Sequence, residues 1–285
     1  MLRSVLFCPA NDVKKAGKAL TSGADAVTLD LEDAVAYSQK AAARECLKEI
    51  LSVAPAKKTF VRINSASSPY ILDDLEAVTG LPLEGLMLAK AETAEEVLRV
   101  DWLLGLMEEK KGLPPGVIKL IPFIESSGGM LSAPAIASCT PRIKALAFGG
   151  VDFSQELGLR YPAESDGLFF ARGQLVIASA KAGIEPPLDT VYPDIQSVAM
   201  LESEAEIARK VGFQGKLVIH PSQVDPVNRT FTPSPQEIEY AGKVVAAFAA
   251  AEKSGTAVIQ VEGRLVEYPI YRRAMEILVL NRQPG

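Results

Sequence analysis

Two acidic residues, Glu125 and Asp152, each stand at the end of a run of apolar residues that is typical of a buried strand. Because neighbouring strands lie about 4.8 Å apart, carboxylates at equivalent heights on consecutive strands can share one ion. Mg²⁺ binds one or two protein carboxylates and leaves its other positions to water and substrate oxygens. The pair therefore favours a Mg²⁺ site, although Asp152 could instead cap the next helix and Glu125 could contact a following serine.

Arg62 and Asn64 lie two residues apart in the segment VRIN, so we expect them to share one face of a third strand. An arginine at the mouth of a barrel offers a planar fork for a carboxylate. The alternative is a salt bridge to a protein acid such as Glu32. Gly149 and Gly150, just before Asp152, permit either a close backbone approach or a tight turn.

Lys90 and His220 also end apolar runs. A buried lysine can form a Schiff base, but acidic neighbours would keep Lys90 charged, and an ion pair with Glu32 or Asp33 is the simpler interpretation. For His220, a structural role is favoured over general-base catalysis. It is the single histidine of the chain, so a multi-histidine zinc site within one chain is excluded, and a catalytic metal must sit on oxygen ligands.

The elements that must position these residues are eight short apolar runs separated by segments with helical spacing. Alternating strands and helices indicate parallel βαβ units, and eight of them favour a closed (β/α)8 TIM barrel, where the polar strand ends would form an active face. We expect this barrel to span residues 1–230. The runs are 4–10, 26–33, 59–65, 85–91, 117–126, 145–152, a weaker 186–194, and 215–223.

Residues 231–285 exceed what a barrel needs. They predict an amphipathic helix, a hairpin with a turn at Gly263 and a closing helix. An isolated hairpin is marginal in water, so we expect this C-terminal extension to act as a lid that packs on its own barrel or on a neighbouring subunit.

The composition narrows the class of protein. The 285 residues carry a formal charge of −5 without a long basic run, which argues against a nucleic-acid partner. The three cysteines lie far apart, which argues against a disulfide framework and fits a reducing compartment. We find neither a signal peptide nor an apolar stretch of membrane-spanning length, and predict a cytoplasmic protein.

Together, the motifs resemble the citrate lyase beta-subunit (CitE-like) family of the HpcH/HpaI aldolase superfamily, which includes malyl-CoA, citramalyl-CoA and citryl-CoA lyases. The resemblance covers nearly the whole chain in order. It is carried by RSVLFCPAND (3–12), LDLEDAV (29–35), FVRIN (60–64), LAKAE (88–92), FIES (123–126), LAFGGVDF (146–153), GKLVIHPSQV (215–224) and FTPSPQEI (231–238).

The resemblance implies a Mg²⁺-dependent barrel that forms a homotrimer or a multiple of one, such as a hexamer. It implies that Glu125 and Asp152 hold Mg²⁺ and, with Arg62 and Gly150, bind the substrate. The same resemblance assigns CoA binding to Phe7, Lys14 and Lys18. Glu32, Asp33, Lys90 and Asn64 would surround the metal ligands and the metal-bound waters and keep them oriented.

One departure from the family concerns the last hairpin. Relatives usually end it with G-x-x-V-D-x-P, whose aspartate reaches a neighbour's active site as acid/base, whereas GRLVEYP puts Glu267 there. The extra methylene shifts the carboxyl group by about a C–C bond, and a misplacement of ~1 Å can cost ~100-fold in rate.

The expected reaction is cleavage of a 3-hydroxyacyl-CoA to acetyl-CoA and a 2-oxo acid. Three alternatives stay open: a thioesterase acting on a malyl-CoA type ester, a class II aldolase acting on free pyruvate-type aldols, and a non-catalytic subunit that binds an acyl-carrier partner.

Overall fold

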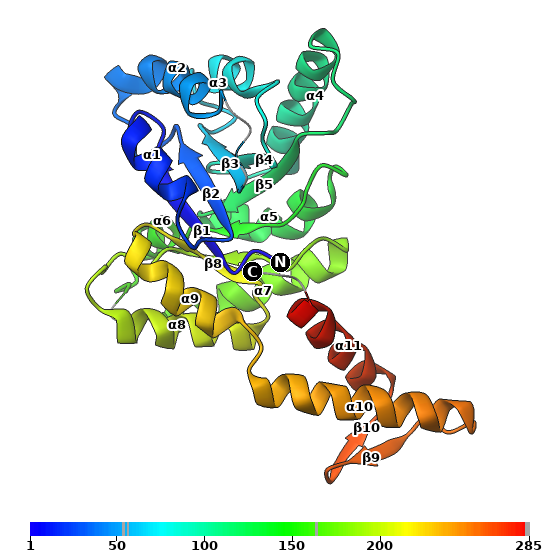
Figure 1. Ribbon diagram of the computed structural model, residues 1–285. Helices are drawn as coiled ribbons and strands as arrows, with labels where there is room; N and C mark the ends of the chain where they lie inside the picture. The colour runs from blue at the N-terminus through cyan, green and yellow to red at the C-terminus, as the bar shows by residue number, and fades with distance from the viewer. Residues whose placement is uncertain (53–54, 56, 163–164, 283–285) are drawn as a thin grey trace. The chain divides into compact units, whose positions relative to one another are not determined.

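The computed structural model describes residues 1–52, 55, 57–162 and 165–282 (Figure 1). Residues 283–285 of the predicted C-terminal extension lie outside the described residues. The chain divides into two compact units, Leu2–Phe231 and the residues from Thr232 onward, and each is described by itself.

The first unit is a closed barrel of eight parallel strands in sequential order, with helices between them, as predicted. Register pairs connect each strand to the next, and pairing of the first strand with the eighth closes the ring. The strands are β1 (Ser4–Pro9), β2 (Ala26–Asp30), β3 (Lys58–Ile63), β4 (Gly85–Leu88), β5 (Lys119–Ile124), β6 (Ala147–Phe148), β7 (Leu188–Asp189) and β8 (Gly215–Val218).

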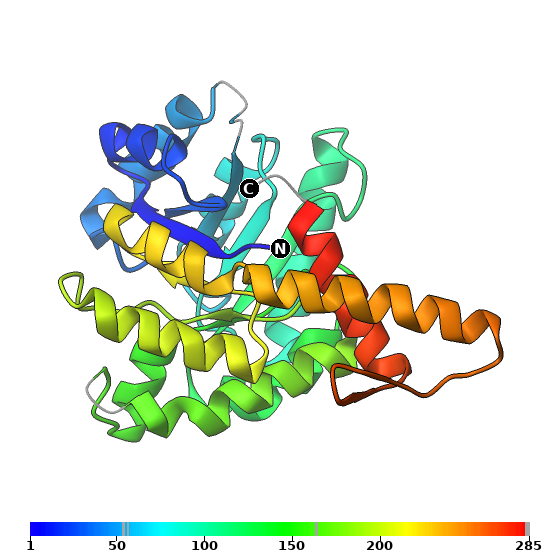
Figure 2. The same cartoon turned by 60° about the horizontal axis from the view of Figure 1, so that its bottom comes forward.

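Helices surround these strands (Figure 1). They are α1 (Val13–Leu20), α2 (Lys40–Ile50), α3 (Ile71–Val78), α4 (Ala94–Lys110), α5 (Ser127–Ser138), α6 (Gly150–Leu157), α7 (Phe169–Ala182), α8 (Val198–Val211) and α9 (Val224–Phe231), with short 3₁₀ turns η1 (Tyr37–Gln39), η2 (Ser165–Leu168) and η3 (Pro221–Gln223). Figure 2 shows the blue strand β1 beside the yellow helix α9, which it contacts.

Side chains alternate between the inside of the barrel and the helix layer, because successive residues of a strand point to opposite faces. Phe60, Met87, Phe123 and other apolar side chains fill the interior. Val61, Leu86 and Ile124, their neighbours in sequence, belong to the larger core between strands and helices. This alternation puts inward-facing polar residues at the strand ends into the barrel mouth.

The sixth and seventh strands are shorter than their apolar runs predicted, because each forms only two residues of ladder. Outside β7 and β8, a buried ion network joins this part of the wall to α7 and α8. Asp189 accepts from Arg172 Nε at 2.8 Å and from Lys216 Nζ at 2.6 Å, and Arg172 also binds Glu204. These four residues, called the wall network below, are almost completely inaccessible to solvent.

The second unit contains the predicted helix, hairpin and helix. These are α10 (Pro235–Lys253), the antiparallel strands β9 (Ile259–Val261) and β10 (Arg264–Val266), and α11 (Tyr268–Arg282). Ser234 caps α10 in a capping box with Glu237, and Phe248 lies at the centre of a small core of its own.

Candidate functional site

Arg62 lies in the barrel mouth near the end of β3, where it is paired in register with Asp30 of β2. Its Nε and Nη2 donate to the two carboxylate oxygens of Asp30 at 2.7 and 2.6 Å. The rings of Phe7 and Phe123 lie 5.2 and 5.6 Å from the guanidinium carbon. A bidentate ion pair, with two aromatic rings packed against the guanidinium, holds this cation in one orientation.

Glu32 and Asp33 follow β2 and face a second cation, Lys90. Lys90 Nζ forms an ion pair with Glu32 and lies 3.4 Å from Asp33, and Arg62 Nη1 lies 3.1 Å from Glu32 Oε2. Burial acts to lower the pKa of Lys90, but Glu32 and Asp33 outweigh it and raise that pKa. Lys90 therefore stays protonated, which confirms the predicted ion pair and disfavours Schiff-base chemistry.

Glu125 directly follows β5 and is only 5% exposed. Its Oε1 accepts the backbone N–H of Lys90 at 2.6 Å, which Lys90 presents from a left-handed backbone conformation with φ of 50°. Burial raises the pKa of Glu125 to about 7, with Glu32 and Asp152 adding to the rise and Arg62 opposing it. The carboxylate is therefore poised to accept positive charge.

Asp152 is placed differently from the prediction. It does not end a strand but lies in the first turn of α6, because β6 stops at Phe148 and the helix begins at Gly150. Nor is it the helix cap, since Gly149 occupies that position. The prediction that it lies near Glu125 survives this correction, because the charge of Asp152 acts on the Glu125 carboxyl group.

The two glycines before Asp152 provide a close backbone approach. A Cβ atom on Gly149 would lie 2.2 Å from Cβ of Glu125, and one on Gly150 would lie 2.9 Å from Thr190 Cγ2. Because real side chains do not approach so closely, both positions need glycine. The absence of these two side chains lets the start of α6 enter the mouth.

These acids and bases form one group, called the mouth cluster below. Its five carboxylates face two cations, so negative charge is in excess. The members are Asp30, Glu32, Asp33, Glu125 and Asp152, with Arg62 and Lys90.

The donor chemistry of the mouth cluster fits Mg²⁺, which prefers oxygen ligands and needs only one or two carboxylates. Within the part of the chain that the structure describes, no group of three or more Asp, Glu, His or Cys side chains is arranged to hold a metal ion. Glu125 and Asp152 are the pair that would hold such an ion, with substrate and water supplying the other ligands.

Sequence reasoning gave Asp30 no role, although LDLED shows it at a strand end. The position of Asp30 at a strand end could be seen in the sequence. Its pairing with Arg62 could not, because that pairing depends on the register between the two strands. The predicted alternative for Arg62, a salt bridge to a barrel acid, is realised with both Asp30 and Glu32.

Asn64 does not share the face of Arg62, contrary to prediction. β3 ends at Ile63, and the Asn64 amide turns to the helix layer, where Nδ2 donates to Asp74 at 2.6 Å and Oδ1 accepts from Lys40 at 3.0 Å. Lys40 also donates to the carbonyl oxygens of Leu31 and Glu32 at 2.6 and 2.8 Å, so Asn64 supports the mouth from behind.

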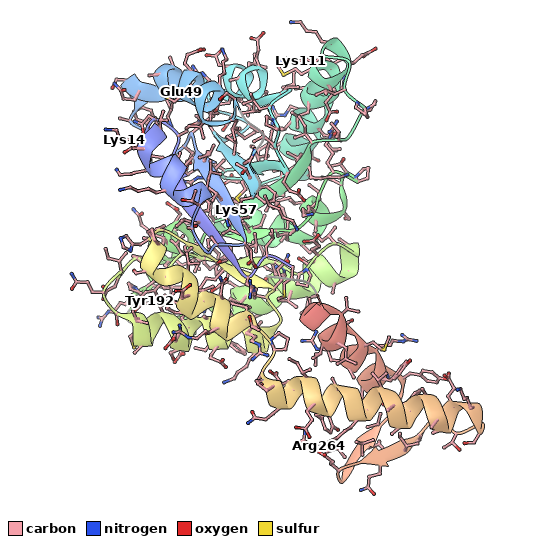
Figure 3. All side chains as sticks on the ribbon, viewed as in Figure 1. Lys14, Glu49, Lys57, Lys111, Tyr192 and Arg264 are labelled. Carbon is pink, nitrogen blue, oxygen red and sulfur yellow. The ribbon has the colours of Figure 1, made fainter. Side chains whose placement is uncertain are left out.

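The three residues that the resemblance assigns to CoA are not gathered at one place. Phe7 is inside the barrel, edge-on to Phe123 and against Arg62. Lys14 and Lys18 are exposed one turn apart on α1, and Lys14 points away from the strands (Figure 3). Glu267 belongs to the other compact unit, where it is exposed directly after β10.

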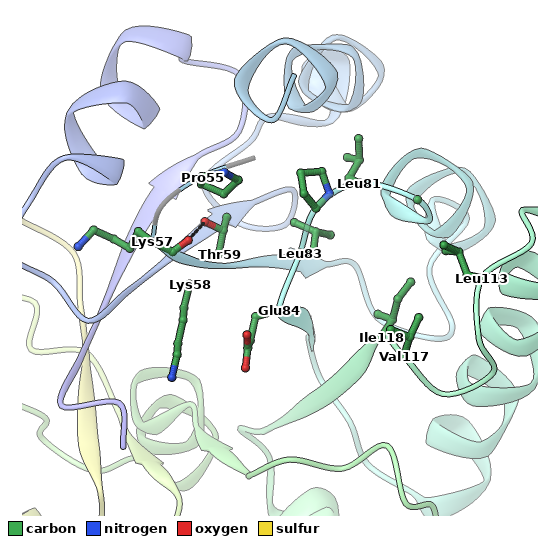
Figure 4. Close-up of a pocket in the computed structure, with 12 residues that line it drawn as sticks. Pro55, Lys57, Lys58, Thr59, Leu81, Leu83, Glu84, Leu113, Val117 and Ile118 are labelled. Atoms are coloured by element: carbon green, nitrogen blue, oxygen red, sulfur yellow. Dashed lines mark hydrogen bonds between the residues drawn. The ribbon is translucent and has the colours of Figure 1, made fainter. Parts of the chain in front are cut away.

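His220 caps the turn η3, and its Nδ1 contacts Ser222 Oγ at 2.8 Å. This confirms the structural interpretation. A pocket near the first residues of β3, β4 and β5 is lined by Lys58, Glu84 and Ile118 among others (Figure 4). It lies at the opposite end of the strands from the mouth cluster, where barrels carry residues for stability and not for catalysis.

Comparison with known proteins is consistent with this geometry. The family model for HpcH/HpaI aldolase/citrate lyase matches residues 3–221, which is most of the chain. The chain belongs to the HpcH/HpaI aldolase/citrate lyase family. The matched segment contains the whole mouth cluster.

Several family members are similar along almost their whole length. Citrate lyase subunit beta of Escherichia coli is 34% identical over 282 residues, covering 98% of this chain and 92% of the relative. A (3S)-malyl-CoA thioesterase of Cereibacter sphaeroides is 34% identical over 267 residues, covering 93% and 89%. The crystal structure of CitE from Mycobacterium tuberculosis with magnesium, acetoacetate and coenzyme A has a TM-score of 0.80 at 31% identity, covering 99% and 98%.

None of the helices in the described residues combines the length and the apolar character needed to cross a bilayer.

Proposed function

We propose that this protein is a Mg²⁺-dependent carbon–carbon lyase that cleaves a 3-hydroxyacyl-CoA of the malyl-, citramalyl- or citryl-CoA type to acetyl-CoA and a 2-oxo acid, in either direction. The observation that carries the proposal is the mouth cluster, where a carboxylate excess adjoins a rigidly held guanidinium. Membership of the family supports it, as does the magnesium in the M. tuberculosis structure.

In this proposal Glu125 and Asp152 hold Mg²⁺. When bound, the ion supplies a positive charge that stabilises negative charge developing on substrate oxygens. Glu32, Asp33 and Lys90 keep the surrounding charge in place, because Lys90 spans the two acids and also donates its N–H to Glu125. The buried position of Glu125 strengthens the interactions that this carboxylate makes, since burial reduces screening by water.

Arg62 binds the carboxylate of the oxo-acid end. A guanidinium has five N–H donors, and its contacts with Asp30 and Glu32 use no more than three of them. Asp30 and the two phenylalanine rings fix its orientation before substrate arrives, so little order is lost on binding. The backbone N–H of Gly150 already donates to Thr190 Oγ1. We therefore expect Gly150 to contribute to substrate binding by letting the substrate approach the backbone closely, and not by donating a hydrogen bond.

The bond that breaks joins C2 and C3 of the hydroxyacyl chain. The C3 hydroxyl loses its proton to solvent and becomes the carbonyl of the 2-oxo acid, while the electron pair of the C2–C3 bond stays on C2 as the enolate of acetyl-CoA. Glu267 of a neighbouring copy donates a proton to C2, and in the reverse direction it removes that proton. Positioned proton transfer of this kind contributes about 10²–10⁴-fold in rate.

CoA recognition in this proposal uses two regions. Lys14 and Lys18, exposed one turn apart on α1, meet the phosphates as point charges. Phe7 lies beside Arg62 and is therefore suited to the acyl end and not to the nucleotide. The C-terminal unit would reach a neighbouring subunit of a homotrimer or hexamer.

The test is to incubate the purified protein and Mg²⁺ with malyl-, citramalyl- and citryl-CoA and measure acetyl-CoA and the 2-oxo acid. Release from at least one substrate is expected, and Asp152→Asn should remove it. No release from any of the three at high enzyme concentration would refute the proposal.

A thioesterase is the second candidate, because the Cereibacter sphaeroides relative with that name is as similar as the citrate lyase subunit. It would yield free CoA and the intact hydroxy acid, so product analysis separates the two. A non-catalytic subunit would show neither product when the protein is assayed alone.

A further inference from the structure

Thr190 directly follows β7 and lies against the start of α6. The residue is 1% exposed, and its Oγ1 accepts the backbone N–H of Gly150 at 2.9 Å. Gly150 is the first residue of the helix whose first turn carries Asp152. A neutral hydroxyl from the seventh strand end therefore holds the segment that positions one carboxylate of the pair.

The same segment is confined from the other side. The position of a Cβ on Gly149 would be 2.2 Å from Glu125 Cβ, and that of a Cβ on Gly150 would be 2.9 Å from Thr190 Cγ2. The glycine pair is thus enclosed between the side chains of Glu125 and Thr190. Little space therefore remains between the start of α6 and these two neighbours.

Thr190 itself is anchored by the residues on both sides of it. The preceding residue, Asp189, is held by two cations of the wall network at 2.8 and 2.6 Å. The carbonyl oxygen of the following residue, Val191, accepts the hydroxyl of Tyr161 at 2.6 Å. The backbone of Thr190 therefore provides a rigid base for its contact with Gly150.

We propose that Thr190 is a positioning residue for the metal site: its hydroxyl fixes the start of α6 and thereby the spacing of the Glu125 and Asp152 carboxylates. The inference rests on the proposed function, in which this pair binds Mg²⁺. Thr190 acts through Gly150. Residues that orient metal ligands in this way typically affect metal affinity by 10–100-fold.

The experiment compares Thr190→Val, which keeps the shape but loses the acceptor, with Thr190→Ser, which keeps the acceptor. Mg²⁺ affinity is measured by isothermal titration calorimetry, and the unfolding midpoint in EDTA reports on the fold. Thr190→Val should bind Mg²⁺ about 10-fold more weakly, whereas Thr190→Ser should resemble the wild type. The activity lost in Thr190→Val should return as Mg²⁺ is raised, which a purely structural defect would not produce.

Wild-type affinity in Thr190→Val would overturn the inference while leaving the proposed function intact. A different result separates the two: if the wild type and Glu125→Gln bind Mg²⁺ alike, the proposed metal site fails and the inference fails with it.

A second pair of variants keeps the test open if Thr190→Val does not fold. Gly150→Ala should weaken Mg²⁺ binding because its methyl group meets Thr190. Adding Thr190→Ser removes the nearest atom, Cγ2, and should restore part of the affinity. Losses that simply add in the double variant would contradict contact between the two residues.

Discussion

The wall network and the mouth cluster are both built from acids and bases, but the wall network is buried throughout, whereas Asp33 and Lys90 of the mouth cluster are exposed. The charges of the two groups are also balanced differently. In the wall network, among the described residues, Arg172 and Lys216 meet Asp189 and Glu204, two cations for two carboxylates. In the mouth cluster, five carboxylates share two cations. Balanced ion pairs, as in the wall network, stabilise the fold. An excess of carboxylates, as in the mouth cluster, leaves negative charge that a bound cation can neutralise.

Removing one charge of the wall network should have the largest effect. Asp189→Asn leaves two buried cations with a single carboxylate, and breaking a buried pair typically costs about 3–5 kcal/mol. We expect the free energy of unfolding, measured by urea titration with a matched Lys243→Met surface variant as control, to fall by about this amount. A loss as small as that of the control would mean that the wall network does not support the fold.

The corresponding change in the mouth cluster should have the opposite sign. The pKa of Glu125 is raised to about 7 from 4.5, so above pH 7 its ionised form opposes folding in the absence of metal. Glu125→Gln should therefore raise the free energy of unfolding in EDTA at pH 8 by up to about 3 kcal/mol.

This gain has a defined pH dependence. It should be complete above pH 7 and become small as the pH falls to 4.5, where the wild-type carboxyl group is protonated in the folded state and half protonated in the unfolded state. Urea unfolding at pH 8 and pH 4.5 checks it. A variant that is less stable than the wild type at pH 8 would show that Glu125 is already compensated without metal.

Mg²⁺ itself should distinguish the two regions. An ion that binds only the folded state adds about 2.7 kcal/mol at 100 times its Kd. We expect Mg²⁺ to raise the melting temperature of the wild type and of Thr190→Ser but not that of Asp152→Asn. Equal shifts in the wild type and Asp152→Asn would place the ion elsewhere.

The smallest effect on stability is expected where charges are neither buried nor paired in a cluster. Replacing Lys14 and Lys18 by alanine should change the free energy of unfolding by no more than about 0.5 kcal/mol. If these lysines bind CoA phosphates, KM should rise for the CoA ester and stay constant for the matching pantetheine ester. A parallel rise for both esters would remove the phosphate role.

The sequence pattern predicts those features of the fold that depend on residues close together in the chain. Apolar runs with polar ends predicted the closed barrel and put Arg62, at the end of the third run, in its mouth. Asp152 was assigned to a strand because apolar residues around Phe148 continue past the short ladder that forms. Asn64 was misassigned because its helix-layer partner Asp74 is fixed only by packing.

The residues missed altogether depend on contacts between distant segments. Thr190 looks like an ordinary strand-end residue until Gly150 is found against it. Lys216 reads as the first polar residue of an apolar run, and only the fold brings Asp189 to it. The roles of Glu267, Lys14 and Lys18 come from family resemblance and remain predictions.

The two-residue ladders of β6 and β7 have a mechanical consequence. Elsewhere around the ring, longer backbone ladders resist separation of neighbouring strands, but this seam has few such bonds. Beside this seam the buried charges of the wall network hold β7 and β8 to the helices, and protonation of its carboxylates in acid can weaken them. Breathing of the barrel should therefore start at this seam, and amides flanking it should exchange with deuterium earlier in acid than those of β2 and β3.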